Sequence, residues 1–208
     1  MPAESPPVIH SVVFDVGGVL IDWDPRHLYR KLFADEDTME HFLSEVCTPA
    51  WHAQHDLGAS YGDTIPALVA AHPQWATEIR AWSERFSEMY GGPIEGTVHL
   101  LRSLQRGGVP VVASTNWGAA SWADARAAYP FLELFDGALV SGEVGIAKPD
   151  PAFYELLVET FGLDPRHTLY IEDTLANVLA AAERGFVTHA FTSPDGLALE
   201  LRRLGLIP

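Results

Sequence analysis

The amino-acid sequence predicts a doubly wound α/β fold, a parallel sheet with helices on both faces, and an all-helical domain inserted near its start. From about residue 93 onward, helix-like and strand-like segments alternate, which is typical of βα units in a parallel sheet. Between about residues 24 and 90 the apolar residues recur only at helical spacing, and no strand-like run occurs. We therefore predict a discontinuous core domain, residues 1–22 and 92–208, and a helical cap domain, residues 23–91.

The first predicted strand is the apolar run Val12-Val13-Phe14, which ends on the carboxylate of Asp15. Two glycines, Gly17 and Gly18, follow almost at once and indicate a tight turn. Ligands of open α/β sheets bind beyond the carboxyl ends of the strands. A carboxylate delivered to that rim is a candidate nucleophile or metal ligand.

Four helices are predicted in the inserted segment. Asp24-Pro25 opens the first, Met39 to Val46 marks the second, Thr64 caps the third, and Ile79 to Met89 marks the fourth. Gly91-Gly92-Pro93 is a strong break that returns the chain to the α/β pattern. Both connections of this insertion leave from the carboxyl ends of the strands, so we expect the cap to lie over that rim.

The remaining elements follow in order, and glycine or proline bounds most of them. A helical face from Val98 to Leu104 ends at Gly107-Gly108, and Asp150 with Pro151 has the pattern of an N-cap and first turn. The predicted strands are 109–113, 138–140, 168–171 and 187–190, and the further helices are 119–128, one from 151, 175–184 and 196–204.

Charge and composition limit the classes of molecule that the protein can bind. The chain has a formal net charge of −15 at pH 7, which argues against nucleic acid or an anionic membrane as a partner, so a phosphorylated substrate needs local positive charge. No apolar run approaches the roughly 18 residues of a membrane span, and the N-terminal residues lack a signal-peptide pattern. The single cysteine, Cys47, cannot form an internal disulfide. We expect a cytoplasmic protein, and the sequence predicts no oligomeric state.

Four polar clusters are expected at one rim of the sheet. Asp15 and the clusters Ser114-Thr115-Asn116 and Glu172-Asp173-Thr174 directly follow strand-like runs, and Lys148-Pro149-Asp150 lies in a turn before a helix. Each cluster alone has an ordinary explanation as a turn or helix cap. Their joint occurrence in this order favours a functional site.

These clusters resemble the four motifs of the haloacid dehalogenase-like (HAD) superfamily of hydrolases, in the subgroup with a small helical cap after the first motif. Asp15 matches the nucleophile, Thr115 with Asn116 the second motif, Lys148 the third, and Glu172-Asp173 the acidic fourth. The resemblance covers nearly the whole chain and implies a Rossmann-like core. In one departure, Gly17 stands where many phosphatases of the family carry an aspartate as general acid and base.

The resemblance implies that the Asp15 carboxylate attacks phosphorus to form an aspartyl-phosphate. Mg²⁺ suits such chemistry, with Asp15, the carbonyl of Gly17 and Asp173 as ligands and Glu172 bound directly or through water. Lys148 would place a positive charge against both Asp15 and the phosphate.

Phosphate binding is expected from Lys148 together with Thr115 and Asn116. Thr115 would offer its hydroxyl and its N–H at the start of a helix.

The leading functional prediction is a Mg²⁺-dependent phosphatase for a small soluble phosphomonoester, such as a sugar phosphate or a nucleotide. The alternatives are a 2-haloacid dehalogenase that uses the same nucleophile and a degenerate binding protein without turnover. Because Gly17 carries no acid, alkyl phosphates should react poorly relative to aryl phosphates, and Asp22 and Asp24 are the next residues that could supply the proton. His52, His55 and Asp56 have a spacing that could hold a metal, but a solvated helix face is the expected explanation.

Overall fold

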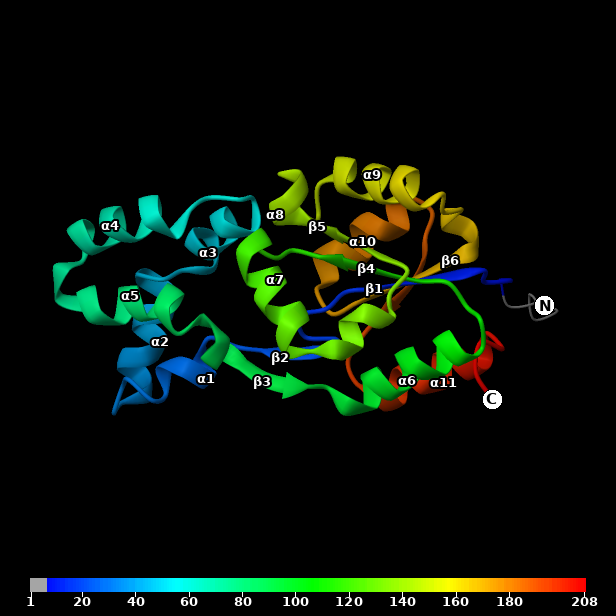
Figure 1. The fold of residues 1–208 in the computed structure, drawn as a ribbon, viewed down its shortest axis with the longest axis horizontal. Helices are drawn as coiled ribbons and strands as arrows, with labels where there is room; N and C mark the ends of the chain where they lie inside the picture. The colour runs from blue at the N-terminus through cyan, green and yellow to red at the C-terminus, as the bar shows by residue number, and fades with distance from the viewer. Residues whose placement is uncertain (1–6) are drawn as a thin grey trace.

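A computed structural model describes residues 7–208 and contains a five-stranded parallel sheet with strand order β5-β4-β1-β6-β7 (Figure 1). The central strand β1 pairs with β4 on one side and β6 on the other. All residues of these three strands are buried, as expected where helices cover both faces. The strands are β1 (Ser11–Phe14), β4 (Val111–Thr115), β5 (Gly137–Val140), β6 (Thr168–Glu172) and β7 (Val187–Ala190).

Helices lie on both faces of this sheet, which confirms the predicted doubly wound architecture (Figure 1). One face packs against α6 (Glu95–Arg106) and α11 (Pro194–Arg203), and the other against α9 (Pro151–Phe161) and α10 (Leu175–Glu183). Successive strand residues point to opposite faces. Val12 and Phe14 accordingly belong to one hydrophobic cluster and Val13 to the other.

Residues 24–89 form a helical lobe at one end of the sheet (Figure 1). Its core is aromatic and contains Tyr29, Phe42 and Trp82. The lobe contains α1 (Arg26–Tyr29), α2 (Glu36–Glu45), α3 (Pro49–Asp56), α4 (Tyr61–Ala71) and α5 (Ala76–Glu84), with short 3-10 helices η1 (Pro73–Trp75) and η2 (Phe86–Met89). The lobe has one α-helix more than predicted, because α3 is a helix of its own between α2 and α4.

The predicted helix cap at Thr64 is wrong. The helix α4 begins earlier, and the Ser60 hydroxyl accepts the N–H of Gly62 there. The Thr64 hydroxyl lies inside the helix and is hydrogen-bonded to the ring of His55, 2.8 Å from Nε2. A hydroxyl residue alone does not identify a cap, since the interior of a helix can satisfy it through a tertiary contact.

The two crossings between core and lobe form an antiparallel ribbon of β2 (Ile21–Trp23) and β3 (Tyr90–Pro93), which the sequence did not predict. Gly91-Gly92-Pro93 was expected to be only a break. Asp22 and His27 occupy the space that a Cβ on Gly91 would need, so the glycine allows the close pairing. The assignment of residues 23–91 to a separate domain stays a prediction, and residues 1–6 of the predicted core segment lie outside the described residues.

Most other boundaries agree with the sequence to within a few residues. The helix α7 spans Ala119–Ala128 as predicted, whereas α11 begins at Pro194 because Ser193 caps it. Cys47 is buried in the turn after α2. None of the helices in residues 7–208 combines the length and apolar character needed to cross a bilayer.

Candidate active site

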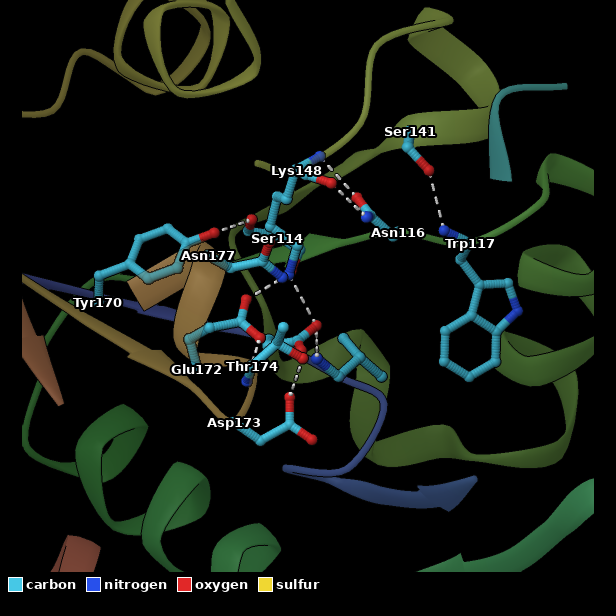
Figure 2. Close-up of polar contacts among 12 residues, drawn as sticks. Ser114, Asn116, Trp117, Ser141, Lys148, Tyr170, Glu172, Asp173, Thr174 and Asn177 are labelled. Carbon is cyan, nitrogen blue, oxygen red and sulfur yellow. Dashed lines mark hydrogen bonds and ion pairs between the residues drawn. The ribbon is translucent and has the colours of Figure 1, made fainter. Parts of the chain in front are cut away.

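The carboxyl ends of three adjacent strands bring the predicted site residues together (Figure 2). Asp15 directly follows β1, and its N–H donates to the carbonyl of Ile171 at 2.9 Å, which extends the pairing with β6. Thr115 ends β4 and Glu172 ends β6. The strand order β4-β1-β6 therefore explains why residues more than 150 positions apart share one rim.

Lys148 occupies the centre of this rim, in the segment before α9. Its Nζ lies 3.0 Å from Asp15 Oδ1 and 2.7 Å from Glu172 Oε2. It also donates to the carbonyl of Ser114 at 3.0 Å. Only 1% of the Lys148 side chain is exposed, so the two carboxylates provide the pairing that a buried ammonium needs.

Asn116 fixes the backbone of Lys148. Its Nδ2 donates to the Lys148 carbonyl at 2.8 Å, and its Oδ1 accepts the Lys148 N–H at 2.8 Å. Ser114 lies beside this contact and shares a 2.6 Å hydrogen bond with the Tyr170 hydroxyl. The Asn116 amide therefore positions Lys148, and its contact with phosphate stays a prediction.

The expectation that Thr115 starts a helix is wrong. Thr115 is the last residue of β4, and α7 begins at Ala119 with Gly118 as its N-cap. The intervening segment is held by Trp117, whose N–H donates to the Ser141 hydroxyl at 2.9 Å. Any anion site at Thr115 would therefore use its hydroxyl and a loop N–H.

Three acids converge beside Lys148. The carboxylate oxygens of Asp15, Glu172 and Asp173 lie within 4.8 Å of one another. Burial and the neighbouring acids raise the pKa of Asp15 against the pull of Lys148, and burial with the contact to Glu172 raises the pKa of Asp173. Although burial opposes it, the ion pair with Lys148 lowers the pKa of Glu172. One ammonium does not balance three carboxylates, so the donor set suits a divalent cation.

The two glycines after Asp15 have different requirements. Gly18 has φ of +73°, and a Cβ there would collide with the Asp173 carboxylate. Gly17 is not among the glycines with positive φ, and a Cβ there would meet only Trp117 Cζ3 at 3.8 Å, an ordinary contact. The backbone thus demands glycine at position 18 but leaves room for a Cβ atom at position 17.

A cavity of about 380 Å³ opens at this rim and is lined from both the core and the helical lobe. Glu172 does not line it and lies behind Lys148. The predicted site residues that line it are Asp15, Gly17, Thr115, Asn116, Lys148 and Asp173. The cavity is also lined by Thr174, which belongs to one of the predicted polar clusters, and by Gly18, Trp23, His52, Asp56, Phe86, Trp117 and Asn177.

The expectation that His52, His55 and Asp56 form a solvated helix face is wrong. His55 is buried, and His52 stacks on Trp23 with ring centroids 5.0 Å apart. Both His52 and Asp56 line the cavity. Helical spacing identified this face of α3 but could not show that the core covers it.

Asp22 and Asp24, the expected substitutes for a missing acid, do not line the cavity. Asp22 lies 3.0 Å from the His27 ring, and Asp24 pairs with Arg26. The sequence does contain a weak indication that Asn177 belongs to the site. This residue lies at the start of α10, four positions after Asp173, a spacing of about one helical turn.

The chain is similar in sequence to known hydrolases. A sequence profile of the haloacid dehalogenase-like hydrolases matches residues 9–185. The chain is 29% identical over 200 residues to the sesquiterpene phosphatase astK of Aspergillus oryzae, covering 93% of this chain and 95% of that protein. It is 27% identical over 198 residues to validoxylamine A 7'-phosphate phosphatase of Streptomyces hygroscopicus subsp. limoneus, covering 90% of this chain and 88% of that protein.

The fold also matches solved structures. One is a HAD-family enzyme of Bacteroides thetaiotaomicron, solved in complex with magnesium and inorganic phosphate. The TM-score is 0.65 at 21% sequence identity, and the match covers 89% of this chain and 95% of that chain.

Proposed function

Because the chain belongs to the haloacid dehalogenase-like hydrolases, we propose that it is a phosphatase that hydrolyses a small phosphomonoester through an aspartyl-phosphate intermediate. The observation that carries this proposal is the pairing of Lys148 with Asp15 at 3.0 Å beside two further acids. The activities named for astK and for the Streptomyces enzyme support it.

We propose Mg²⁺ as the cofactor because three carboxylates face one ammonium at the rim. Asp15, Asp173 and the Gly17 carbonyl would hold the ion, with Glu172 bound directly or through water. Bound there, Mg²⁺ would supply positive charge against the oxygens of the transferring phosphoryl group. The magnesium and inorganic phosphate bound to the Bacteroides enzyme support the choice of this ion.

The chain's own residues account for the remaining steps. The Asp15 carboxylate forms a bond to phosphorus while the ester P–O bond breaks, which splits hydrolysis into two easier reactions. Lys148 would hold a fixed positive charge beside both the Asp15 carboxylate and the phosphoryl group. Electrostatic stabilisation of this kind dominates phosphoryl transfer. Water then attacks phosphorus and releases Asp15 and inorganic phosphate.

The cavity favours a substrate with one phosphate and an uncharged leaving alcohol. Lys148 is the one cation among the lining residues of the described chain, whereas Asp15, Asp56 and Asp173 are acidic. Trp23 and Trp117 add aromatic surface that suits the face of a ring. A sugar phosphate or a nucleoside monophosphate meets these conditions. We further propose that residues 23–91 act as a cap that completes the cavity and limits access of water.

A panel of phosphomonoesters and 2-haloacids, assayed with Mg²⁺ and with excess chelator, tests this function. We expect Mg²⁺-dependent release of phosphate and no release of halide, because Glu172 and Asp173 beside Asp15 repel a carboxylate substrate. Metal-independent release of halide would instead establish the dehalogenase. Turnover of neither class would favour a binding protein.

A further inference from the structure

Phosphate ester hydrolysis at this rim needs a group that protonates the leaving oxygen and later activates water. Gly17 cannot serve, since it has no side chain. We propose that Asp56, carried by α3 of the helical lobe, is the general acid and base of this site. The inference rests on the proposed phosphatase function and adds a catalytic residue to it.

Asp56 is placed for direct contact with a substrate. It lines the same cavity as Asp15, Gly17 and Lys148. Its side chain is 14% exposed, yet it takes part in no hydrogen bond within the described part of the chain. The carboxyl group is therefore enclosed but uncommitted, as a group that exchanges protons with a bound substrate must be.

The helix α3 holds Asp56 in a defined position against the core. Thr48 caps the helix by accepting the Trp51 N–H at 3.0 Å, and the His55 ring bonds to the Thr64 hydroxyl. At the core, a Cβ on Gly118 would lie 3.2 Å from the His55 carbonyl oxygen, so the two backbones approach closely. A side chain on an anchored helix is positioned more precisely than one on a loop.

The surroundings of Asp56 favour proton exchange near neutral pH. Burial raises its pKa to about 7, although Lys148 opposes the shift. A catalytic group works best when its pKa lies near the working pH, because both protonation states are then populated.

The neighbouring titratable groups do not ionise Asp56. The nearest is His52, whose Nε2 lies 3.7 Å from Asp56 Oδ1. Burial lowers the pKa of His52 to about 4, so this ring is neutral at pH 7 and forms no ion pair. Burial also raises the pKa of the Tyr61 hydroxyl beyond the physiological range. Of the titratable groups around the cavity outside the acid cluster, Asp56 is thus the one that can both give and take a proton.

The proposed proton transfers balance over the two half-reactions. In the first, Asp15 bonds to phosphorus, the ester P–O bond breaks, and the Asp56 carboxyl gives its proton to the departing oxygen. A neutral alcohol leaves. In the second, the Asp56 carboxylate takes a proton from water as the water oxygen bonds to phosphorus and the P–O bond to Asp15 breaks. Inorganic phosphate leaves, and Asp56 is protonated again. With Asp56 in this role, alkyl phosphates should no longer show the poor reactivity relative to aryl phosphates that the missing acid at Gly17 led us to expect.

The test compares wild type, Asp56→Asn and the control Gln54→Ala on the exposed side of α3, using alkyl phosphates and p-nitrophenyl phosphate. Loss of the acid should lower kcat/KM for alkyl phosphates by roughly 10²-fold or more, within the usual range for general acid catalysis. The loss for p-nitrophenyl phosphate should stay below about tenfold, because that leaving group needs little protonation. Loss of the base should make p-nitrophenol appear as a burst while the aspartyl-phosphate accumulates.

Two further measurements keep the inference falsifiable. In Asp56→Asn, the added change Gly17→Asp should restore alkyl phosphate turnover, because position 17 lines the cavity and a Cβ there makes only an ordinary contact. In wild type, kcat/KM for alkyl phosphates divided by kcat/KM for aryl phosphates should fall as pH rises through about 7, because Asp56 then ionises. This measurement uses the wild-type protein and does not depend on whether a variant folds.

An equal loss for both substrates without a burst or rescue, or a pH-independent ratio, would overturn the role of Asp56. Wild-type protein that cleaves no phosphomonoester would instead overturn the proposed function and this inference with it.

Discussion

Lys148 Nζ lies closer to Glu172 Oε2, at 2.7 Å, than to the candidate nucleophile Asp15, at 3.0 Å. Glu172 is fully buried and does not line the cavity. Its second oxygen accepts the N–H of Thr174 at 3.1 Å. Glu172 therefore anchors the lysine from behind, which leaves Asp15 as the acid that both touches Lys148 and faces the cavity.

Glu172→Gln should destabilise the fold, because it leaves a buried ammonium with one carboxylate fewer. Breaking a buried ion pair typically costs about 3 to 5 kcal/mol. We expect a loss in that range in the free energy of unfolding, measured by urea denaturation at pH 7. The double variant Glu172→Gln/Lys148→Met should recover part of it, since the unpaired charge is then gone. No recovery would argue against the ion pair as the cause.

Asp15→Asn should abolish turnover and leave the fold intact, since the amide is nearly isosteric but cannot attack phosphorus. Steady-state assays and circular dichroism measure the two effects. Asp22→Asn is the matched control, because Asp22 lies outside the cavity, and it should keep its activity. Substantial activity in folded Asp15→Asn would exclude this residue as the nucleophile.

Asp173→Ala should weaken both the affinity for Mg²⁺ and the rate, because the cation loses one of the acids at the rim. Titration calorimetry with Mg²⁺ and activity as a function of Mg²⁺ concentration give the two readouts. Excess chelator should abolish activity in wild type. Unchanged Mg²⁺ affinity in Asp173→Ala would remove this residue from the metal site.

Gly17→Ala and Gly18→Ala should differ in sign. At position 17 the added methyl has room and φ is not positive, so alanine should be neutral or stabilising by up to about 1 kcal/mol. At position 18 the positive φ and the Asp173 carboxylate should make alanine destabilising by more than about 1 kcal/mol. Thermal unfolding compares them directly. Equal losses would mean that position 17 also requires glycine.

Asp56→Asn should stabilise the protein at high pH but not at low pH. The pKa of Asp56 is raised from 3.8 to about 7, so between these values the folded state binds more protons than the unfolded state, and stability falls as pH rises. At about 1.4 kcal/mol per pKa unit, the cost above pH 7 is at most roughly 4 kcal/mol. Denaturant unfolding at pH 4 and pH 8 should therefore show a gain only at pH 8. A gain that is equal at both pH values would contradict a buried, titrating carboxyl.

The amino-acid sequence by itself determined the elements of the core and the order of its motifs. Apolar runs that stop at Asp15, at the cluster Ser114-Thr115-Asn116 and at Glu172 identify three strand ends, and Asp150 with Pro151 identifies a helix start. These features are local, because an apolar run and a helix cap are each formed by residues a few positions apart. Parallel pairing then brings those strand ends to one rim, so the acidic cluster was also predictable, whereas the place of Lys148 beside it followed from the resemblance to the hydrolase family.

Only the tertiary structure decided what covers each face of the helical lobe. Periodicity shows that His52 and Asp56 share a face of α3, but contact with the core across about 60 to 90 residues of chain encloses that face. The β2–β3 ribbon depends likewise on two distant segments, one of them rich in glycine. Tertiary packing thus brought Asp56 of the lobe into the cavity that Gly17 also lines, which the local sequence around Gly17 does not show.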